Sequence, residues 1–276
     1  MRASSLPTLL SLFVLLVPIS IANSRTWHIT PDGTGDAPFL VAAMDSAAAG
    51  DTVLVAPGEY VLAPTRVTDG IVLLSEAGPL QTRLVGYPGV NGGLACSQLN
   101  RQTEISGFWF EGFTESGFLG TGVISIFQSN QILVHDCVFA NNSKAGISVN
   151  SEWWTQIERN TFVGNKYSIY APSWYGMCRD NIFWGPIAST GQAMYFACND
   201  AVNLLDIPAV YRPANFSLDP QFCAVGDYRV MTSSPCAPGN SPLGNGCHLV
   251  GALPADCKPL IIQKSTWGAV KALYRN

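Results

Sequence analysis

Short apolar runs recur through residues 104–198 in a phrase that always ends in phenylalanine. The phrase begins with an apolar residue or a cysteine five places earlier and passes through polar residues or glycine. Its copies occupy residues 105–110, 134–139, 157–162 and 178–183. A second apolar run follows each copy, at residues 123–127, 146–149, 168–170 and 193–196. The phenylalanines lie 29, 23 and 21 residues apart, and a period in the twenties built from short strands indicates a solenoid.

Strands this short do not form a stable sheet alone, but they gain pairing partners if each coil stacks on the last at about 4.8 Å per step. We expect the repeated phenylalanines to point inward as one stack: Phe110, Phe139, Phe162 and Phe183. Asn160 and Asn181 suit the corner between strands, where asparagine tolerates left-handed backbone and bonds its counterpart in the next coil. Cys137 and Phe108 hold this place in earlier coils, so we expect an asparagine ladder of two rungs.

The fold class that follows is all-β, a parallel β-helix. A leucine-rich repeat has a similar period, but its L-x-x-L-x-L pattern is missing and no repeat carries a helix. Charged residues make up only 12% of the chain and 26 residues are glycine, which favours a β-solenoid over helical repeats.

The segment before the repeat predicts a cap. Residues 27–30 read as a short strand, and Asp36 is placed to cap a helix over residues 37–48. Its apolar side would carry Phe39, Leu40, Ala43 and Met44. An amphipathic helix laid across the open end of the first coil protects that end.

Several of these segments together resemble a known group. They are Asp-Gly-Thr-Gly-Asp at 32–36, the Ala-rich helix, Gly-Asp-Thr-Val-Leu-Val at 50–55 and Pro-Gly-Glu-Tyr at 57–60. They are similar to the N-terminal cap and first coil of secreted right-handed parallel β-helix proteins of the pectin-lyase-like superfamily. Residues 219–222, 227–230, 234–236 and 251–252 resemble the closing segment of the same group. The resemblance covers about residues 27–253 and implies a right-handed parallel β-helix with an N-terminal capping helix. For activity it implies polysaccharide lyases and glycoside hydrolases.

The ends of the chain define the domain organisation. Residues 1–24 read as a signal peptide, with Arg2 at its start, an apolar core at 9–19 and a cleavage site at 22–24. There are two alternatives: cleavage after Ala22, or a segment that stays uncleaved as a membrane anchor. Residues 25–257 form the β-helix with its closing segment. Residues 258–276 form a tail, either a short amphipathic helix or a frayed terminus. The expected location is secreted or at the cell surface.

Eight cysteines behind a signal peptide indicate an oxidising compartment. Four of them crowd the C-terminal region, and we expect local pairs, Cys223–Cys236 and Cys247–Cys257. Cys137 and Cys178 fall at inward positions. If they form no disulfide, we expect them to be buried free thiols. There is no C-x-x-C and no histidine beside a second ligand, so we expect no metal and no cofactor.

The charge balance limits the kinds of partner that the protein can bind. The formal net charge is −4 and no basic patch stands out, so nucleic acid is not expected. No other segment reaches transmembrane length, so no membrane partner is expected after signal removal, and the protein is expected to be a monomer. The expected partner is a polysaccharide, by the resemblance.

The second apolar run of each repeat would form the sheet that floors a substrate groove in this superfamily. Its outward residues would be Ser125, Ser148, Tyr170 and Tyr195. This row has no carboxylate, so it lacks the calcium-binding aspartates of pectate lyases, and the catalytic motifs of polygalacturonases and pectate lyases are also missing.

Aromatic and basic residues flank this row. Glu152, Trp153 and Trp154 occupy the place that Trp174 and Tyr175 occupy one coil later, so their rings would form a platform for sugar rings, or else pack against the solenoid. The predicted substrate-binding residues are Trp153, Trp154, Trp174, Tyr175 and Tyr195.

On the other flank, Glu115, Lys144 and Lys166 lie in successive loops. Lys144 and Lys166 would serve as base and enolate-stabilising cation and Tyr170 as proton donor in β-elimination on a uronate polymer. If they have no catalytic role, both lysines would be solvated surface residues.

Two other functions stay open. Hydrolysis needs two carboxylates roughly 5–10 Å apart, and Glu111 with Glu115 or Glu152 with Glu158 are conceivable pairs. The rival from another class is a non-catalytic surface or adhesion protein that uses the β-helix as a rigid scaffold.

Overall fold

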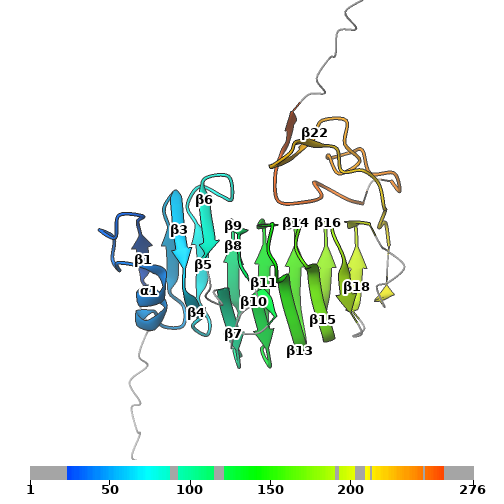
Figure 1. Cartoon of the computed structure of the whole chain (residues 1–276). Helices are drawn as coiled ribbons and strands as arrows, with labels where there is room; N and C mark the ends of the chain where they lie inside the picture. Colours follow the sequence, from blue (N-terminus) through cyan, green and yellow to red (C-terminus); the bar gives the residue numbers. More distant parts are fainter. Residues whose placement is uncertain are drawn as a thin grey trace, which may run out of the picture.

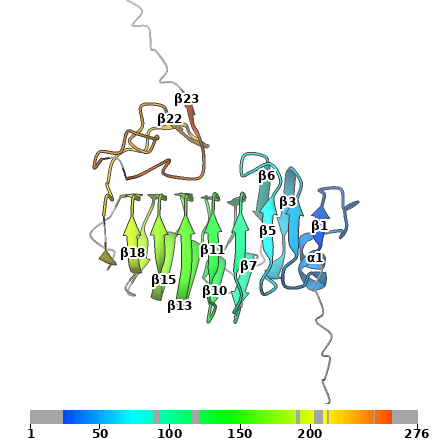
Figure 2. The ribbon, with the colours of Figure 1, turned by 180° about the vertical axis from the view of Figure 1, so that it is seen from behind.

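The computed structural model describes residues 24–87, 93–114, 121–189, 193–202, 209–211, 213–244 and 246–257. The predicted tail and Glu115 lie outside these residues, as does all of the predicted signal peptide except Ser24. Figures 1 and 2 show a stack of coils whose strands pair in parallel with the strands of the coils before and after. This confirms the predicted parallel β-helix.

The strands form three rows, which we call faces 1, 2 and 3. Face 1 consists of β4 (Pro64–Arg66), β7 (Gly93–Ser97), β10 (Gly122–Phe127), the first parts of β13 (Ala145–Glu158) and β15 (Tyr167–Arg179), and β17 (Ile187–Ser189). Face 2 consists of β1 (Thr26–Ile29), β2 (Thr52–Val55), β5 (Val72–Ser75), β8 (Thr103–Ser106), β11 (Ile132–His135), the second parts of β13 and β15, β18 (Ala193–Ala197) and β20 (Ala209–Tyr211). Because β13 and β15 continue round the corner, faces 1 and 2 merge into one 13-stranded sheet.

Face 3 is the seven-stranded sheet. It consists of β3 (Gly58–Leu62), β6 (Thr82–Gly86), β9 (Trp109–Glu111), β12 (Val138–Ala140), β14 (Thr161–Val163), β16 (Ile182–Trp184) and β19 (Asp200–Ala201). Its inward phenylalanines stack as predicted, with ring centroids 4.9 Å apart for Phe110 and Phe139, 4.8 Å for Phe139 and Phe162, and 5.1 Å for Phe162 and Phe183. The stack continues to Phe196 at 5.8 Å.

The asparagine ladder has twice the expected number of rungs. Asn160, Asn181, Asn199 and Asn215 bond in series. The side-chain carbonyl of each of the last three accepts from the backbone N–H of the asparagine before it. The prediction of two rungs was wrong because Asn199 and Asn215 begin coils without the phenylalanine phrase. A second ladder joins Asn142 Nδ2 to Asn165 Oδ1 at 2.7 Å.

The cap is shorter than predicted. α1 spans Leu40–Ser46 and buries Leu40, Ala43 and Met44 as expected. Phe39 is exposed, and Asp36 does not cap the helix. Its carboxylate instead accepts from the His28 backbone N–H at 2.8 Å and pairs with Arg25.

The predicted local disulfides were wrong. The disulfides are Cys198–Cys247 and Cys223–Cys257, with separations of 49 and 34 residues. Loop-closure entropy grows slowly with length, so short spacing is a weak guide to pairing. Cys137 and Cys178 are buried and free, as are Cys96 and Cys236.

The closing segment (residues 213–257) contains β21 (Phe222–Ala224), β22 (Asp227–Met231) and β23 (Ala255–Cys257). It folds back over the outer surface of face 3, as Figure 1 shows beside β14 and β16. Tyr228 stacks on Trp109 with centroids 5.4 Å apart, and the outward Val138 and Ala140 are fully buried. This cover explains why β12 is apolar on both sides.

Candidate functional site

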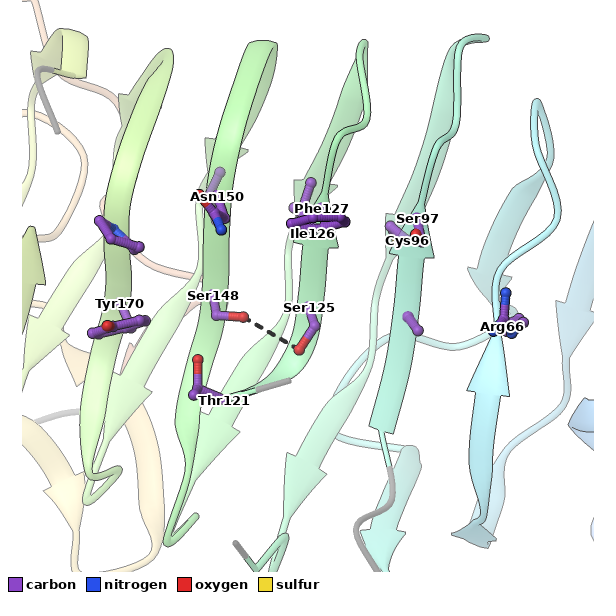
Figure 3. Close-up of a pocket in the computed structure, with 13 residues that line it drawn as sticks. Arg66, Cys96, Ser97, Thr121, Ser125, Ile126, Phe127, Ser148, Asn150 and Tyr170 are labelled. Carbon is purple, nitrogen blue, oxygen red and sulfur yellow. Dashed lines mark hydrogen bonds between the residues drawn. The ribbon is translucent and has the colours of Figure 1, made fainter. Parts of the chain in front are cut away.

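A groove runs across the outer surface of face 1 (Figure 3). Its volume is about 550 Å³, within the range of ligand-binding pockets. One row of residues crosses it in register from strand to strand: Arg66, Ala95, Ser125, Ser148 and Tyr170. Four strand spacings separate the ends of this row, a length of roughly 19 Å. The site is therefore long enough for an extended ligand.

The floor of the groove is hydroxylic. Ser148 Oγ donates to Ser125 Oγ at 3.2 Å, the bond drawn in Figure 3, and Ser125 Oγ also bonds the backbone of Gly122. Both serines are at most 9% exposed. Small side chains here keep the floor low, since a large residue would fill the groove.

The walls combine a cation, an amide and aromatic rings. Arg66 is exposed at one end and Tyr170 is half-buried at the other, with Phe127 and Asn150 along one side. Phe127 is 44% exposed. Sequence reasoning missed Arg66, Phe127 and Asn150. Arg66 belongs to a coil that has no phenylalanine phrase. In that coil Leu84 takes the place of the phenylalanine, because it is in register with Phe110 of the next coil.

Tyr195 does not belong to this row, contrary to the predicted alignment. Ala188 of β17 follows Tyr170 on face 1, whereas Tyr195 pairs with Met177 on face 2. The repeat was misread because β17 is only three residues long and follows the last phenylalanine phrase directly.

The predicted aromatic positions are equivalent in successive coils, but their rings do not share one surface. Trp153 stacks on Tyr175 with centroids 5.1 Å apart at 12°, and both rings are exposed. Trp174 is only 2% exposed, so this ring packs inside the corner and is not available to a ligand. Trp154 lines a separate cavity on face 2.

The three predicted catalytic residues are only partly brought together. The backbone N–H of Lys166 donates to the carbonyl of Lys144 at 3.1 Å, so the two lysines are neighbours in successive coils as expected. The side chain of Lys144 is 1% exposed, which corrects the expectation that it lies at the surface. Lys166 is exposed, with Nζ 5.9 Å from the Tyr167 ring centroid, and that ring lies 6.0 Å from Tyr170.

Carboxylates lie away from the groove. None of the residues that line it is Asp or Glu, and within the described residues no three His, Cys, Asp or Glu side chains cluster as a metal site would require. On face 2, His135 bonds Asp136 at 2.6 Å and Glu104 at 3.0 Å, and Arg159 joins the same network. Burial lowers the pKa of His135, but these bonds outweigh it and the net shift is upward. Each of these charged groups has a partner within the network, which connects neighbouring strands of face 2.

The parallel coils, the inward stacks and a groove across one face define the protein as a parallel β-helix. A family model described as a right handed beta helix region matches residues 91–183, in agreement with a right-handed coil. The chain is a right-handed parallel β-helix with an N-terminal capping helix. No curated protein and no solved structure matches the chain.

Proposed function

We propose that this protein is secreted or held at the cell surface and binds an extended polysaccharide in the groove of face 1. The observation that carries the proposal is the groove itself: a floor of serine hydroxyls, aromatic side chains on its walls and room for several sugar units. Hydroxyls and amides bond sugar hydroxyls, and aromatic faces pack on the apolar faces of sugar rings.

Arg66 gives the groove a preference for an acidic polymer. Its guanidinium is exposed at one end, where it can pair with a carboxylate in bidentate geometry. The two disulfides are compatible with an oxidising compartment. Among the described residues, no helix is long and apolar enough to cross a membrane.

The geometry supports binding more directly than cleavage. β-Elimination needs a base at the sugar carbon and a cation beside the enolate. Lys166 and Tyr170 stay candidates for these steps, because Tyr167 connects them at one end of the groove. Lys144 is enclosed and cannot reach the polymer in this conformation.

Affinity electrophoresis through gels that contain pectin, alginate or neutral glucans tests the proposal. We expect the mature protein to be retarded by an acidic polysaccharide, and Tyr170→Ala to lose most of that retardation. Tyr87→Ala, which removes an exposed tyrosine outside the groove, is the matched control. No retardation in any gel would favour the scaffold function. A parallel incubation, followed by the ultraviolet absorbance of unsaturated uronate, tests cleavage.

A further inference from the structure

A second cavity lies on face 2, separate from the groove. It has a volume of about 370 Å³ and is lined by Gln102, Gln131, Leu133, Trp154 and Gln156. None of these residues lines the groove. All five are uncharged, whereas the groove carries an arginine, so the two sites suit ligands of different charge.

Three successive coils build this cavity. Thr103 pairs with Ile132, so the residues before them, Gln102 and Gln131, stand side by side at the corner that leads into face 2. Leu133 pairs with Gln156 one coil further on. The register neighbours of Leu133 are Glu104 and Gln156, and the ring of Trp154, 60% exposed, completes the lining of the cavity.

The backbone at Trp154 is left-handed. Its φ is +63°, and the register between β13 and β15 shifts between Trp153 and Thr155. Gln131 also has a positive φ, +56°. Non-glycine residues rarely adopt this conformation, but eleven of the described residues do so, most of them at corners between strands, so the positive φ follows from the geometry of the coil. At Trp154 this backbone conformation accompanies a change of direction between two neighbouring tryptophan side chains. Trp153 stacks on Tyr175, whereas Trp154 lines the cavity.

We propose that this cavity binds an uncharged pyranose unit, stacked on the indole of Trp154 and held by the amides of Gln131 and Gln156. An indole face matches the apolar C–H face of a pyranose. Each glutamine amide both donates and accepts, as sugar hydroxyls do. The absence of charge among the lining residues disfavours a uronate, whose carboxylate would lose hydration without gaining a cation. This second site does not depend on binding in the groove.

The test is isothermal titration of the mature protein with neutral oligosaccharides of glucose, mannose, galactose, xylose and N-acetylglucosamine, and with tetragalacturonate. Trp154→Gly removes the ring and suits a positive φ, so it avoids the strain that alanine would retain. We expect it to weaken binding of the neutral ligand about tenfold or more. Trp154→Phe keeps an aromatic face and should retain part of the affinity. Gln156→Ala should weaken binding, and Gln81→Ala, at an exposed glutamine outside the cavity, should not.

The groove variant separates this inference from the proposed function. Tyr170→Ala should leave neutral binding unchanged, and Trp154→Gly should leave tetragalacturonate binding unchanged. Loss of neutral binding in Tyr170→Ala with none in Trp154→Gly would overturn the second site, because the neutral ligand would then occupy the groove. Failure of all neutral oligosaccharides to bind would also overturn it, whatever the result with tetragalacturonate.

Discussion

At the scale of single residues, buried polar side chains hold the coils together. Asn181 is fully buried, and its carbonyl accepts from the Asn160 backbone N–H at 2.8 Å while its amide donates to the Ile157 carbonyl at 2.8 Å. The Asn160 N–H lies at the corner between β13 and β14, outside both strands, and Ile157 lies near the end of β13. One side chain therefore completes the backbone hydrogen bonding of two coils.

We predict that Asn181→Ala lowers the free energy of unfolding by about 2–4 kcal/mol, because buried backbone groups lose their partners. Denaturant unfolding measures the loss. Asn130→Ala, which removes only a 3.4 Å bond between exposed side chains, should change it by less than about 0.5 kcal/mol. Equal losses in the two variants would contradict the role of the ladder.

Asp200 makes stability depend on pH. It is 1% exposed, and burial raises its pKa from 3.8 to about 6, although its bonds to the Leu218 N–H and the Cys236 thiol oppose the shift. The folded state thus holds this proton more tightly than the unfolded state. Stability from this group is present below about pH 4 and is lost as pH rises to about 6.

We therefore predict that Asp200→Asn, which keeps an acceptor for Leu218, stabilises the protein above pH 7 by up to about 3 kcal/mol. Near pH 4 the variant and the wild type should be equally stable. Unfolding free energies at both pH values measure the effect, and a difference that does not change with pH would refute this explanation.

At the scale of elements, the phenylalanine stack joins successive strands of face 3. Phe162 is fully buried between Phe139 and Phe183. Gly146 packs directly against it, since a Cβ there would lie 2.6 Å from the ring. The ring of Phe162 is thus fixed both along the stack and by Gly146.

Phe162→Ala should cost about 3–5 kcal/mol of unfolding free energy, because neighbouring coils cannot close the cavity. Thermal or denaturant unfolding measures it. Phe39→Ala, at a phenylalanine that is 58% exposed, should have almost no effect. A loss below about 1 kcal/mol for Phe162→Ala would show that the stack does not hold the coils.

The elements in which one residue type repeats could be predicted from the sequence. Features that depend on the place of a short strand without a repeated residue could not. The stacked phenylalanines were predictable because the same large side chain recurs in the same phrase. β17 and the place of Tyr195 were not, because a three-residue strand has no distinctive pattern. The burial of Lys144 and the pairing of Cys198 with Cys247 were not predictable either, because residue spacing does not encode which distant parts of the chain pack together.

At the scale of the whole molecule, the three faces have different roles. The closing segment covers the outer surface of face 3, where Tyr228 stacks on Trp109. Face 2 carries a charge network around His135 and the amide-lined cavity. Face 1 carries the groove, with its serine floor. Binding of a polymer in the groove requires face 1 to be open to it.

Blocking the groove tests this claim most directly. Ala95 lies in its floor between Arg66 and Ser125, while Ala188 belongs to the same outward row beyond Tyr170 and does not line it. The ligand is an acidic oligosaccharide taken from the polysaccharide that retards the protein in affinity gels. Isothermal titration with this ligand would compare Ala95→Leu with Ala188→Leu. We predict that Ala95→Leu weakens binding at least about tenfold, because the added side chain fills the site, and that Ala188→Leu binds as the wild type does. Unchanged binding in a folded Ala95→Leu protein would contradict the proposed groove.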